Sequence, residues 1–141
     1  MASANVELVR SVCSEWERGE YRSNEWADSD IDFLFADGPA PGRWTGLAEM
    51  AEGWRAWLGG WEDFRQEAEE YREVDSERVL VLFRASGRGK TSRLNLEKMA
   101  GQGAGLFHVR RGKVIRFVIY LDREHALAEL GLEGEGHAPQ S

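Results

Sequence analysis

The segment FRASGRGKTS, residues 83–92, contains the residue types of a phosphate-binding loop. Gly89, Lys90 and Thr91 match the end of a Walker A motif, in which backbone N–H groups and a lysine hold nucleotide phosphates. The apolar run 79–83 precedes them, as a strand precedes such a loop. Asp122 follows the apolar segment VIYL, where a magnesium-binding aspartate would stand. Taken alone, these residues indicate nucleotide hydrolysis.

The spacing of the other residues argues against a phosphate-binding loop. A Walker A motif requires a glycine five residues before Gly89, and this position is occupied by Arg84. After Thr91 apolar and polar residues alternate, which is the period of a strand, whereas a phosphate-binding loop begins a helix. We therefore interpret Gly87–Gly89 as a hairpin turn between two strands and Lys90 as a solvated lysine.

The histidines and the single cysteine form no metal-binding pattern. His125 and His137 lie at no ligand spacing from Cys13 or from another histidine, so we expect neither a metal nor a cofactor. His108 is expected on the outer face of its strand, where it is exposed or part of an interface. Asp122 is expected to cap a helix.

Helices are expected mainly before the strands. Apolar residues at helical spacing predict a helix over 5–20, capped by Asn5 and ended by Gly19, and another from the cap Thr45 to Gly59. A last short helix follows Asp122. Strands are predicted over 31–35, 63–74, 78–86, 91–99, 106–111 and 113–121, and residues 36–46 are predicted as a loop. This order favours an α+β fold with an antiparallel sheet.

Composition limits the classes of partner. The 141 residues, 42% of them apolar, suit one domain, which we place at 1–132 with a disordered tail at 133–141. The net charge of −7 comes with scattered basic residues, so we expect no nucleic-acid binding. No apolar run reaches the length of a membrane span, and we expect a cytoplasmic protein without membrane contact.

The sequence resembles a known family. The segments GRWTGLAEMAEGWRAWL and HVRRGKVIRFVIYLDREHALAELGL are similar to the SnoaL-like branch of the nuclear-transport-factor-2-like (ketosteroid-isomerase-like) superfamily, and the resemblance covers residues 5–132. It implies a cone-shaped, curved antiparallel sheet wrapped around N-terminal helices, with a pocket at the wide end. It also implies a homodimer.

The resemblance further implies which side chains face the pocket. On the strand from Val79 the inward residues would be Leu80, Leu82, Arg84 and Ser86. The expected ligand-binding residues are Trp16, Phe35, Trp54, Leu82, Ser86, Asn95, Phe107, Phe117 and Ile119.

Two known catalytic sets of the superfamily are incomplete here. Limonene epoxide hydrolases use an arginine and two aspartates, and the matching positions hold Arg84, Ser86 and Ile119. Ketosteroid isomerases use a tyrosine and two aspartates, and the matching positions hold Val12, Phe35 and Gly105. We expect neither activity, because proton transfer requires a titratable group at the reacting atom.

These observations leave two functional hypotheses. The first is a protein that binds a hydrophobic small molecule without evident catalysis. The alternative is an isomerase, cyclase or epoxide-hydrolase-type enzyme in which Arg84 polarises a carbonyl or epoxide and Glu97 acts as general base. Arg84 and Glu97 could equally form a structural ion pair, or Arg84 could reach solvent at the rim.

The apolar run 79–83 also predicts an interface. If Leu80 and Leu82 face the helices, then Val79, Val81 and Phe83 lie on the outer face beside Val118 and Tyr120. An exposed apolar patch of this kind usually marks an interface, so we expect a homodimer through the outer face of the sheet.

Overall fold

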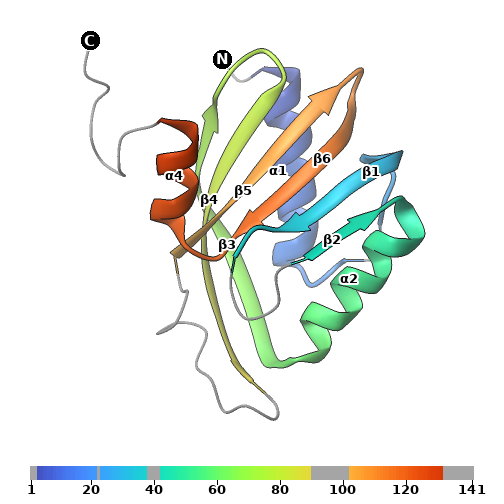
Figure 1. Cartoon of the computed structure of the whole chain (residues 1–141), viewed down its shortest axis with the longest axis vertical. Coiled ribbons are helices and arrows are strands. Elements are labelled where there is room, and N and C mark those ends of the chain that lie inside the picture. Colours follow the sequence, from blue (N-terminus) through green and yellow to red (C-terminus); the bar gives the residue numbers. More distant parts are fainter. Residues whose placement is uncertain (1–2, 22, 38–41, 90–101, 132–141) are drawn as a thin grey trace.

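The computed structural model describes residues 3–21, 23–37, 42–89 and 102–131. Within them the helices are α1 (Ala4–Glu17), α2 (Leu47–Gly59) and α4 (Arg123–Leu130). The strands are β1 (Ala27–Phe35), β2 (Gly42–Thr45), β3 (Trp61–Glu73), β4 (Arg78–Gly89), β5 (Gln102–Arg110) and β6 (Lys113–Tyr120). All six strands join one curved sheet in the order β2-β1-β6-β5-β4-β3 (Figure 1).

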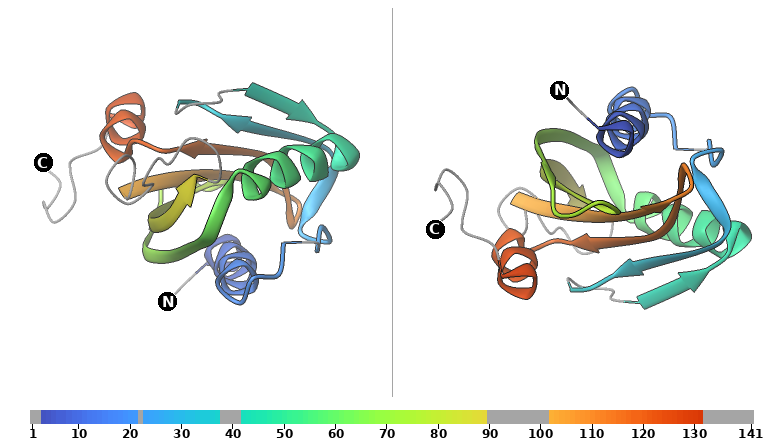
Figure 2. Two further views of the ribbon diagram at one scale, coloured as in Figure 1. Left: turned by 90° about the horizontal axis from the view of Figure 1, so that it is seen from below. Right: turned by 90° about the horizontal axis from the view of Figure 1, so that it is seen from above.

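The sheet confirms the predicted α+β cone, with one difference in strand direction. β1 pairs with β6 in parallel, whereas the other neighbouring strands are antiparallel. α1 lies on one side of the sheet and α4 on the other (Figure 2). α1 packs against β3 and β4, and α2 packs against β1, β2 and β3. We call the side covered by α1 and α2 the inner face.

α1 forms because its apolar residues recur at helical spacing. Val6, Val9, Val12, Cys13 and Trp16 are buried on one side of it. Its N-cap is Ser3, whose Oγ accepts a hydrogen bond from the Val6 N–H at 3.1 Å, so the prediction of Asn5 as the cap is wrong. Asn5 instead donates to the Ser76 carbonyl at 2.9 Å.

The segment before α2 is more regular than expected. β2 falls inside the predicted loop 36–46 and pairs with β1, so that part of the loop prediction is wrong. α2 begins after Gly46 and not after a Thr45 cap. Gly46, the N-cap, makes no side-chain capping hydrogen bond, and the Glu49 carboxylate accepts the Thr45 N–H just before it at 2.9 Å.

β4 is longer than predicted. It continues through Gly89, and Arg88 and Gly89 pair with Glu62 and Trp61 of β3. The predicted turn at Gly87–Gly89 is therefore wrong. The predicted strand 91–99 and the tail 133–141 lie outside the described residues, so they stay predictions.

Two apolar clusters pack on opposite faces of the sheet. The inner cluster joins α1 and α2 to side chains of β1, β4, β5 and β6. The outer cluster joins Ala126 and Leu127 of α4 to Leu80, Leu82, Ala104, Val118 and Tyr120. As predicted, Asp122 caps α4, where its carboxylate accepts the Glu124 N–H at 3.1 Å.

Candidate functional site

Six of the predicted pocket residues meet on the inner face. They are Trp16, Phe35, Trp54, Phe107, Phe117 and Ile119. The rings of Trp16, Trp54, Phe107 and Phe117 pack against one another. The Phe107 and Phe117 rings stack with centroids 4.3 Å apart, and the Trp16 and Trp54 rings lie 5.2 Å apart. Aromatic contact therefore fills much of the space that the sequence predicted as an open cavity.

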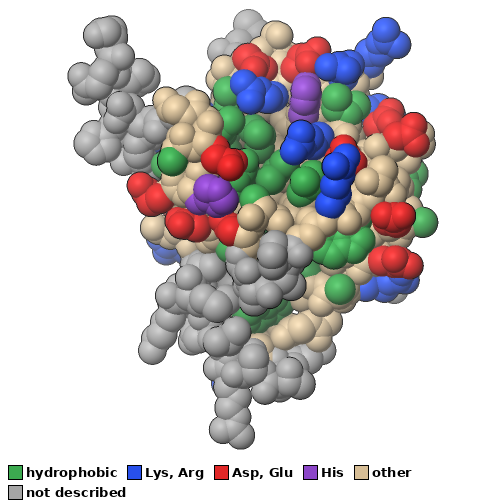
Figure 3. Space-filling view, in the orientation of Figure 1, with side chains coloured by type: hydrophobic (Ala, Val, Ile, Leu, Met, Phe, Trp, Pro, Cys, Tyr) green, Lys and Arg blue, Asp and Glu red, His purple; other side chains and the backbone are tan. Residues whose placement is uncertain are grey.

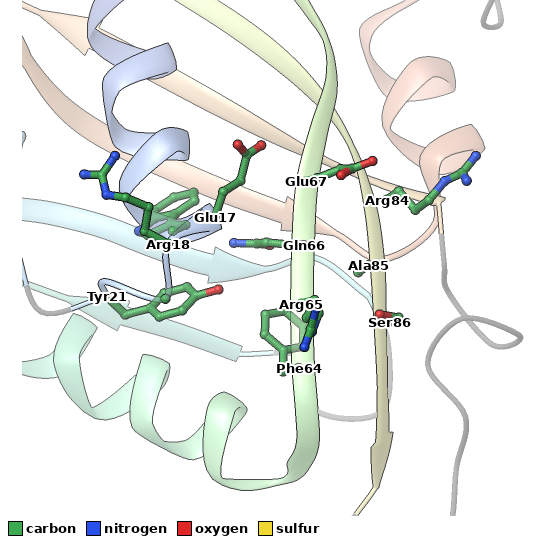
Figure 4. A pocket seen from close by; sticks show the side chains of 12 residues that line it. Glu17, Arg18, Tyr21, Phe64, Arg65, Gln66, Glu67, Arg84, Ala85 and Ser86 are labelled. Atoms are coloured by element: carbon green, nitrogen blue, oxygen red, sulfur yellow. The ribbon is translucent and has the colours of Figure 1, made fainter.

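Leu82 and Arg84 lie on the other face, and the prediction that they face the pocket is wrong. Leu82 is buried in the outer cluster with α4. The Arg84 side chain is 61% exposed and forms an ion pair with Glu69, with Nε and Oε2 3.3 Å apart. Figure 4 shows Arg84 extending away from the inner face, to the same side as its strand partner Glu67. A guanidinium at this place cannot polarise a group bound among the inner rings.

The wrong assignment of inward and outward side chains on β4 has a physical cause in its sequence. Residues 79–83 are all apolar and all buried, so their pattern does not alternate and does not indicate which set faces inward. Val79, Val81 and Phe83 pack with the inner cluster, and Leu80 and Leu82 are covered by α4. The predicted interface of Val79, Val81 and Phe83 is therefore wrong as well.

Of the remaining predicted site residues, the structure describes only Ser86. Ser86 lines the edge of a groove on the surface, described below. Asn95 and Glu97 lie outside the described residues, so neither their place nor a role as pocket or catalytic residues is tested.

Gly105 explains why one family carboxylate has no room here. It occupies the position that matched an aspartate of ketosteroid isomerases. A Cβ atom on Gly105 would lie 2.8 Å from the rings of both Phe117 and Phe83. A longer side chain at this place would have to displace both rings, which costs packing energy.

A small inner cavity remains between the aromatic rings, with a volume of about 30 Å³. Its lining is mostly apolar, and the Gln66 amide is its main polar side chain. The lining residues are Trp54, Trp57, Phe64, Gln66, Phe83, Ala85, Gly103, Ala104, Phe117, Ile119, Tyr120 and Leu121. None of these side chains carries a charge at neutral pH.

A larger groove opens beside this cavity, between the C-terminal end of α1 and strands β3 and β4 (Figure 4). We call it the α1–β3 groove. Its volume of about 590 Å³ falls in the usual range of small-molecule sites. Trp16, Tyr21 and Phe64 provide its aromatic walls, and Phe64, Gln66 and Ala85 line both the groove and the inner cavity. Charged residues also line the groove, namely Glu17, Arg18, Arg65, Glu67 and Arg84.

Tyr21 separates the α1–β3 groove from a second groove. The second groove, of about 780 Å³, runs along α2 and is lined by Met50, Trp54 and Leu58 among others. The Tyr21 ring lies 5.3 Å from Trp54 and 6.3 Å from Trp16, between centroids. Burial raises the pKa of Tyr21 to about 12, against the effect of the nearby Gln66 amide, so its hydroxyl stays protonated at neutral pH.

Sequence reasoning missed Tyr21, Phe64 and Gln66. A signal for two of them was present, because Phe64, Gln66 and Ala68 alternate with the charged residues of β3. Such alternation is typical of a strand with one buried face, and it places these three on the inner side. Tyr21 lies in a connection without periodicity, and nothing in the sequence marks it.

A polar network lies on the outer face, around α4. The Asp37 carboxylate is 2.7 Å from His125 Nδ1 and accepts the Leu121 N–H at 2.6 Å. The Tyr120 hydroxyl donates to Glu129 at 2.7 Å. The hydrogen bond that His125 donates to the Asp37 carboxylate raises the pKa of His125 above its ordinary value. These contacts attach α4 to the sheet.

Neither a metal-binding cluster nor a membrane-spanning helix occurs in the described residues. No group of three His, Cys, Asp or Glu side chains in them is arranged to hold a metal ion. None of their helices is long and apolar enough to cross a membrane.

Known proteins share the sequence pattern and the fold of this chain. The sequence profile of the SnoaL-like domain matches residues 24–117, which is more than half of the chain. The chain belongs to the SnoaL-like domain family. No curated protein matches this SnoaL-like chain.

Solved structures share the fold. A nuclear-transport-factor-2-like protein of unknown function from Burkholderia pseudomallei superposes with a TM-score of 0.72 at 18% identity, covering 90% of this chain and 97% of its own. TerC, co-crystallised with polyporic acid, superposes with a TM-score of 0.65 at 21% sequence identity. The match covers 91% of this chain and 98% of TerC. A candidate SnoaL-like polyketide cyclase from Mesorhizobium loti superposes with a TM-score of 0.67 at 15% sequence identity. The match covers 81% of this chain and 96% of that protein. At these identities the likeness shows the fold of the SnoaL-like chain alone.

Proposed function

We propose that this SnoaL-like protein binds a hydrophobic small molecule on the inner face of its sheet. The observation that carries the proposal is the α1–β3 groove, which has aromatic walls and shares three lining residues with the apolar inner cavity. Small-molecule sites usually combine aromatic walls with a small number of polar groups, and here charged residues line the groove beside the aromatic walls. Burial of a ligand's apolar surface between these rings would supply the driving force.

A protein of the same fold that was crystallised with a small molecule supports the proposed binding function. TerC, which shares the fold, was co-crystallised with the small molecule polyporic acid. The Mesorhizobium loti relative is a candidate polyketide cyclase, and that name also implies a small organic substrate. Both likenesses concern the fold, so the ligand of this chain has to be argued from its own residues.

The enzymatic alternative lacks its central residue. It required an inward Arg84, whereas the guanidinium is mostly exposed and paired with Glu69. Its second member, Glu97, lies outside the described residues. We therefore propose binding without assigning a reaction.

The binding proposal is tested with Nile red, a neutral apolar dye whose fluorescence rises when it leaves water. We expect saturable binding to the wild type, and strongly reduced binding to Ala85→Phe, because Ala85 lines both the groove and the inner cavity. Ala56→Phe is the control, since it adds the same ring at an exposed position of α2. Equal binding by wild type and Ala85→Phe, with both folded, would refute this location.

We also propose a homodimer through the outer face, with a corrected set of residues. Leu34, Leu106 and Leu130 are only partly buried there, beside Val118 and Tyr120. We call these five residues the outer patch. Figure 3 shows apolar side chains gathered at the centre of this face, with charged groups around them. Apolar surface of this kind favours pairing with a second copy. A cytoplasmic location and the 1–132 domain boundary stay predictions.

A further inference from the structure

A row of apolar side chains crosses the outer face of the sheet from strand to strand. Its members pair in register on β4, β5, β6 and β1, and they are Leu80, Leu106, Val118 and Leu34. We call them the apolar row. α4 covers Leu80, whereas Leu106 and Leu34 are only partly buried. The open part of the apolar row therefore lies over β5, β6 and β1, with Val118 at its centre.

The row on one side of the apolar row is basic. Arg78, His108 and Arg116 lie opposite one another on β4, β5 and β6, and we call them the basic row. Each lies two residues from a member of the apolar row and so on the same face. Like charges at opposite positions of neighbouring strands are unfavourable. Arg78 Nε lies 2.8 Å from an oxygen of Asp75, which compensates its charge. In the same way, His108 Nε2 lies 2.8 Å from an oxygen of Glu77.

Arg116 has no such compensation. It is exposed, and it forms no hydrogen bond or ion pair with another residue in the part of the chain that the structure describes. Its neighbour on β1 is Asp32. The Asp32 carboxylate already accepts hydrogen bonds from Arg43 at 2.8 Å and from the Thr45 hydroxyl at 3.0 Å. A guanidinium keeps its charge at every physiological pH, so Arg116 is available to an acidic group from another molecule.

An acidic group lies on the other side of the apolar row. Tyr120 follows Val118 by two residues on β6, and its hydroxyl donates to a Glu129 oxygen at 2.7 Å. The Glu129 side chain is 54% exposed, so its carboxylate can accept further hydrogen bonds. Arg116, Val118 and Glu129 line one hollow of about 550 Å³. Since Val118 lies midway between Arg116 and Tyr120 along β6, the positive and negative groups lie on opposite sides of the apolar row.

Two simple symmetric arrangements bring the apolar rows of two copies together. If the two-fold axis runs along the strands, the basic row of one copy faces the basic row of the other, and like charges repel. If the axis runs along the apolar row, Val118 faces its counterpart and the two flanking sides are exchanged. Figure 3 shows Lys and Arg side chains on one side of the apolar centre of this face and a group of Asp and Glu side chains on the other.

We propose that a second copy of this chain binds the outer face with the two-fold axis along the apolar row, so that Arg116 of each copy forms an ion pair with Glu129 of the other. This inference rests on the proposed homodimer through the outer patch, and it adds the orientation of the two copies and the residues that determine it. The apolar contacts supply most of the affinity. The charge pairs disfavour the arrangement in which the basic rows meet.

Charge reversal tests the pairing. Arg116→Glu and Glu129→Arg each place like charges at both symmetric contacts of the dimer. We therefore expect either variant to raise the dissociation constant of the dimer at least about tenfold, as measured by sedimentation equilibrium. Arg55→Glu is the matched control, because it makes the same change at an exposed position of α2 and should leave the constant unchanged.

An equimolar mixture of the two variants tests whether the two residues meet. In a heterodimer of Arg116→Glu with Glu129→Arg, both contacts again join opposite charges, so we expect its dissociation constant to return close to the wild-type value. Native mass spectrometry identifies the heterodimer by its mass, and its formation also shows that both variants are folded.

Salt gives an independent measurement of the same contacts. Raising the NaCl concentration from about 0.05 M to about 0.5 M should weaken the wild-type dimer and strengthen the homodimer of each variant, since salt screens attraction and repulsion alike. The Arg55→Glu control should respond to salt as the wild type does.

The outcomes separate this inference from the homodimer itself. If the wild type is a dimer but both variants dimerise equally well, or if the heterodimer is no more stable than the two variant homodimers, the proposed orientation is wrong and the homodimer stands. If Leu106→Arg also leaves the dimer intact, the outer face is not the interface and both proposals are refuted. A monomeric wild type refutes both as well.

Discussion

Arg123 and Glu69 form an ion pair at 2.7 Å in which the arginine is only 3% exposed. Arg123 is the first residue of α4, and it also donates a hydrogen bond to the Phe83 carbonyl at 2.8 Å. The same Glu69 carboxylate pairs with Arg84, which is mostly exposed. One carboxylate thus joins a buried and an exposed arginine, and the two pairs are expected to differ in their contribution to stability.

Arg123→Leu should lower the free energy of unfolding by about 2–3 kcal/mol, because it leaves buried acceptors unpaired. Arg84→Leu should lower it by at most about 1 kcal/mol, since exposed ion pairs contribute little. Urea unfolding of the wild type and the two variants measures both losses in the free energy of unfolding. Equal losses would show that the burial of Arg123 does not determine its contribution.

Gly105→Ala should destabilise the protein by about 1–3 kcal/mol, because its new Cβ meets the Phe117 and Phe83 rings at 2.8 Å. Gly59→Ala is the matched control. It adds the same methyl group where no atom lies within 4 Å, at the last residue of α2, and it should be neutral or slightly stabilising. Thermal melts of both variants decide between the two expectations. A neutral Gly105→Ala would mean that the inner rings have room to move.

The stability of the protein should fall as the pH rises from 6 to 8. The hydrogen bond that His125 donates to the Asp37 carboxylate raises the pKa of folded His125. A raised folded pKa gives stability that is fully present below the ordinary value of 6.5 and is lost as the pH passes through the folded pKa. The side chain is 35% exposed, so we expect a small effect.

Melting temperatures measured across this pH range give the slope. His125→Gln and Asp37→Asn should both flatten it. Glu129→Gln should change it less, because the His125–Glu129 contact is longer, at 3.4 Å. A slope that persists in His125→Gln would assign the pH dependence to another group.

Cys13 should resist thiol reagents in the folded protein. It is buried in α1, and burial raises its pKa to about 12, so the reactive thiolate is scarce at pH 8. We expect labelling by dithiobis(nitrobenzoic acid) to be at least about a hundredfold slower than after denaturation in guanidinium chloride, which exposes the thiol. Rapid labelling of the native protein would mean that α1 leaves the sheet readily.

The outer patch should hold two copies together. Light scattering at micromolar concentration is expected to give about twice the 16.0 kDa chain mass. Leu106→Arg, at the centre of the patch, should halve this value, whereas Ala56→Arg on the exposed side of α2 should not. A monomeric wild type, or a dimer that tolerates Leu106→Arg, would contradict the interface.

The resemblance, combined with the alternation of side chains along a strand, predicted the orientation of several side chains. On β5 and β6 the sequence placed Phe107, Phe117 and Ile119 inward and His108 outward, and the structure confirms these positions. On β4 five consecutive apolar residues gave no alternation, and the family match supplied the wrong choice for Arg84. The choice depends on α4, which covers Leu80 and Leu82 from outside.

The candidate site was predictable only in its apolar part. Large aromatic residues at helical or strand spacing indicated an inner cluster, and Trp16 and Trp54 lie in it. The polar feature of the site is Gln66 on β3, an ordinary residue on a strand of mainly charged ones. Its burial follows from the packing of α1 and Tyr21 over that strand, which local sequence does not reveal.

The parallel pairing of β1 with β6 has a consequence for how the chain folds during synthesis. Phe33 lies beside Phe117 in this pair, so residues 84 positions apart must meet before the sheet is continuous. Until β6 has left the ribosome, the β1–β2 hairpin has no neighbouring strand to join. Contacts of such long separation slow folding, and they delay it until nearly the whole domain has been made. Through most of translation, the hairpin's aromatic side chains therefore depend on α2, or on a chaperone, for cover.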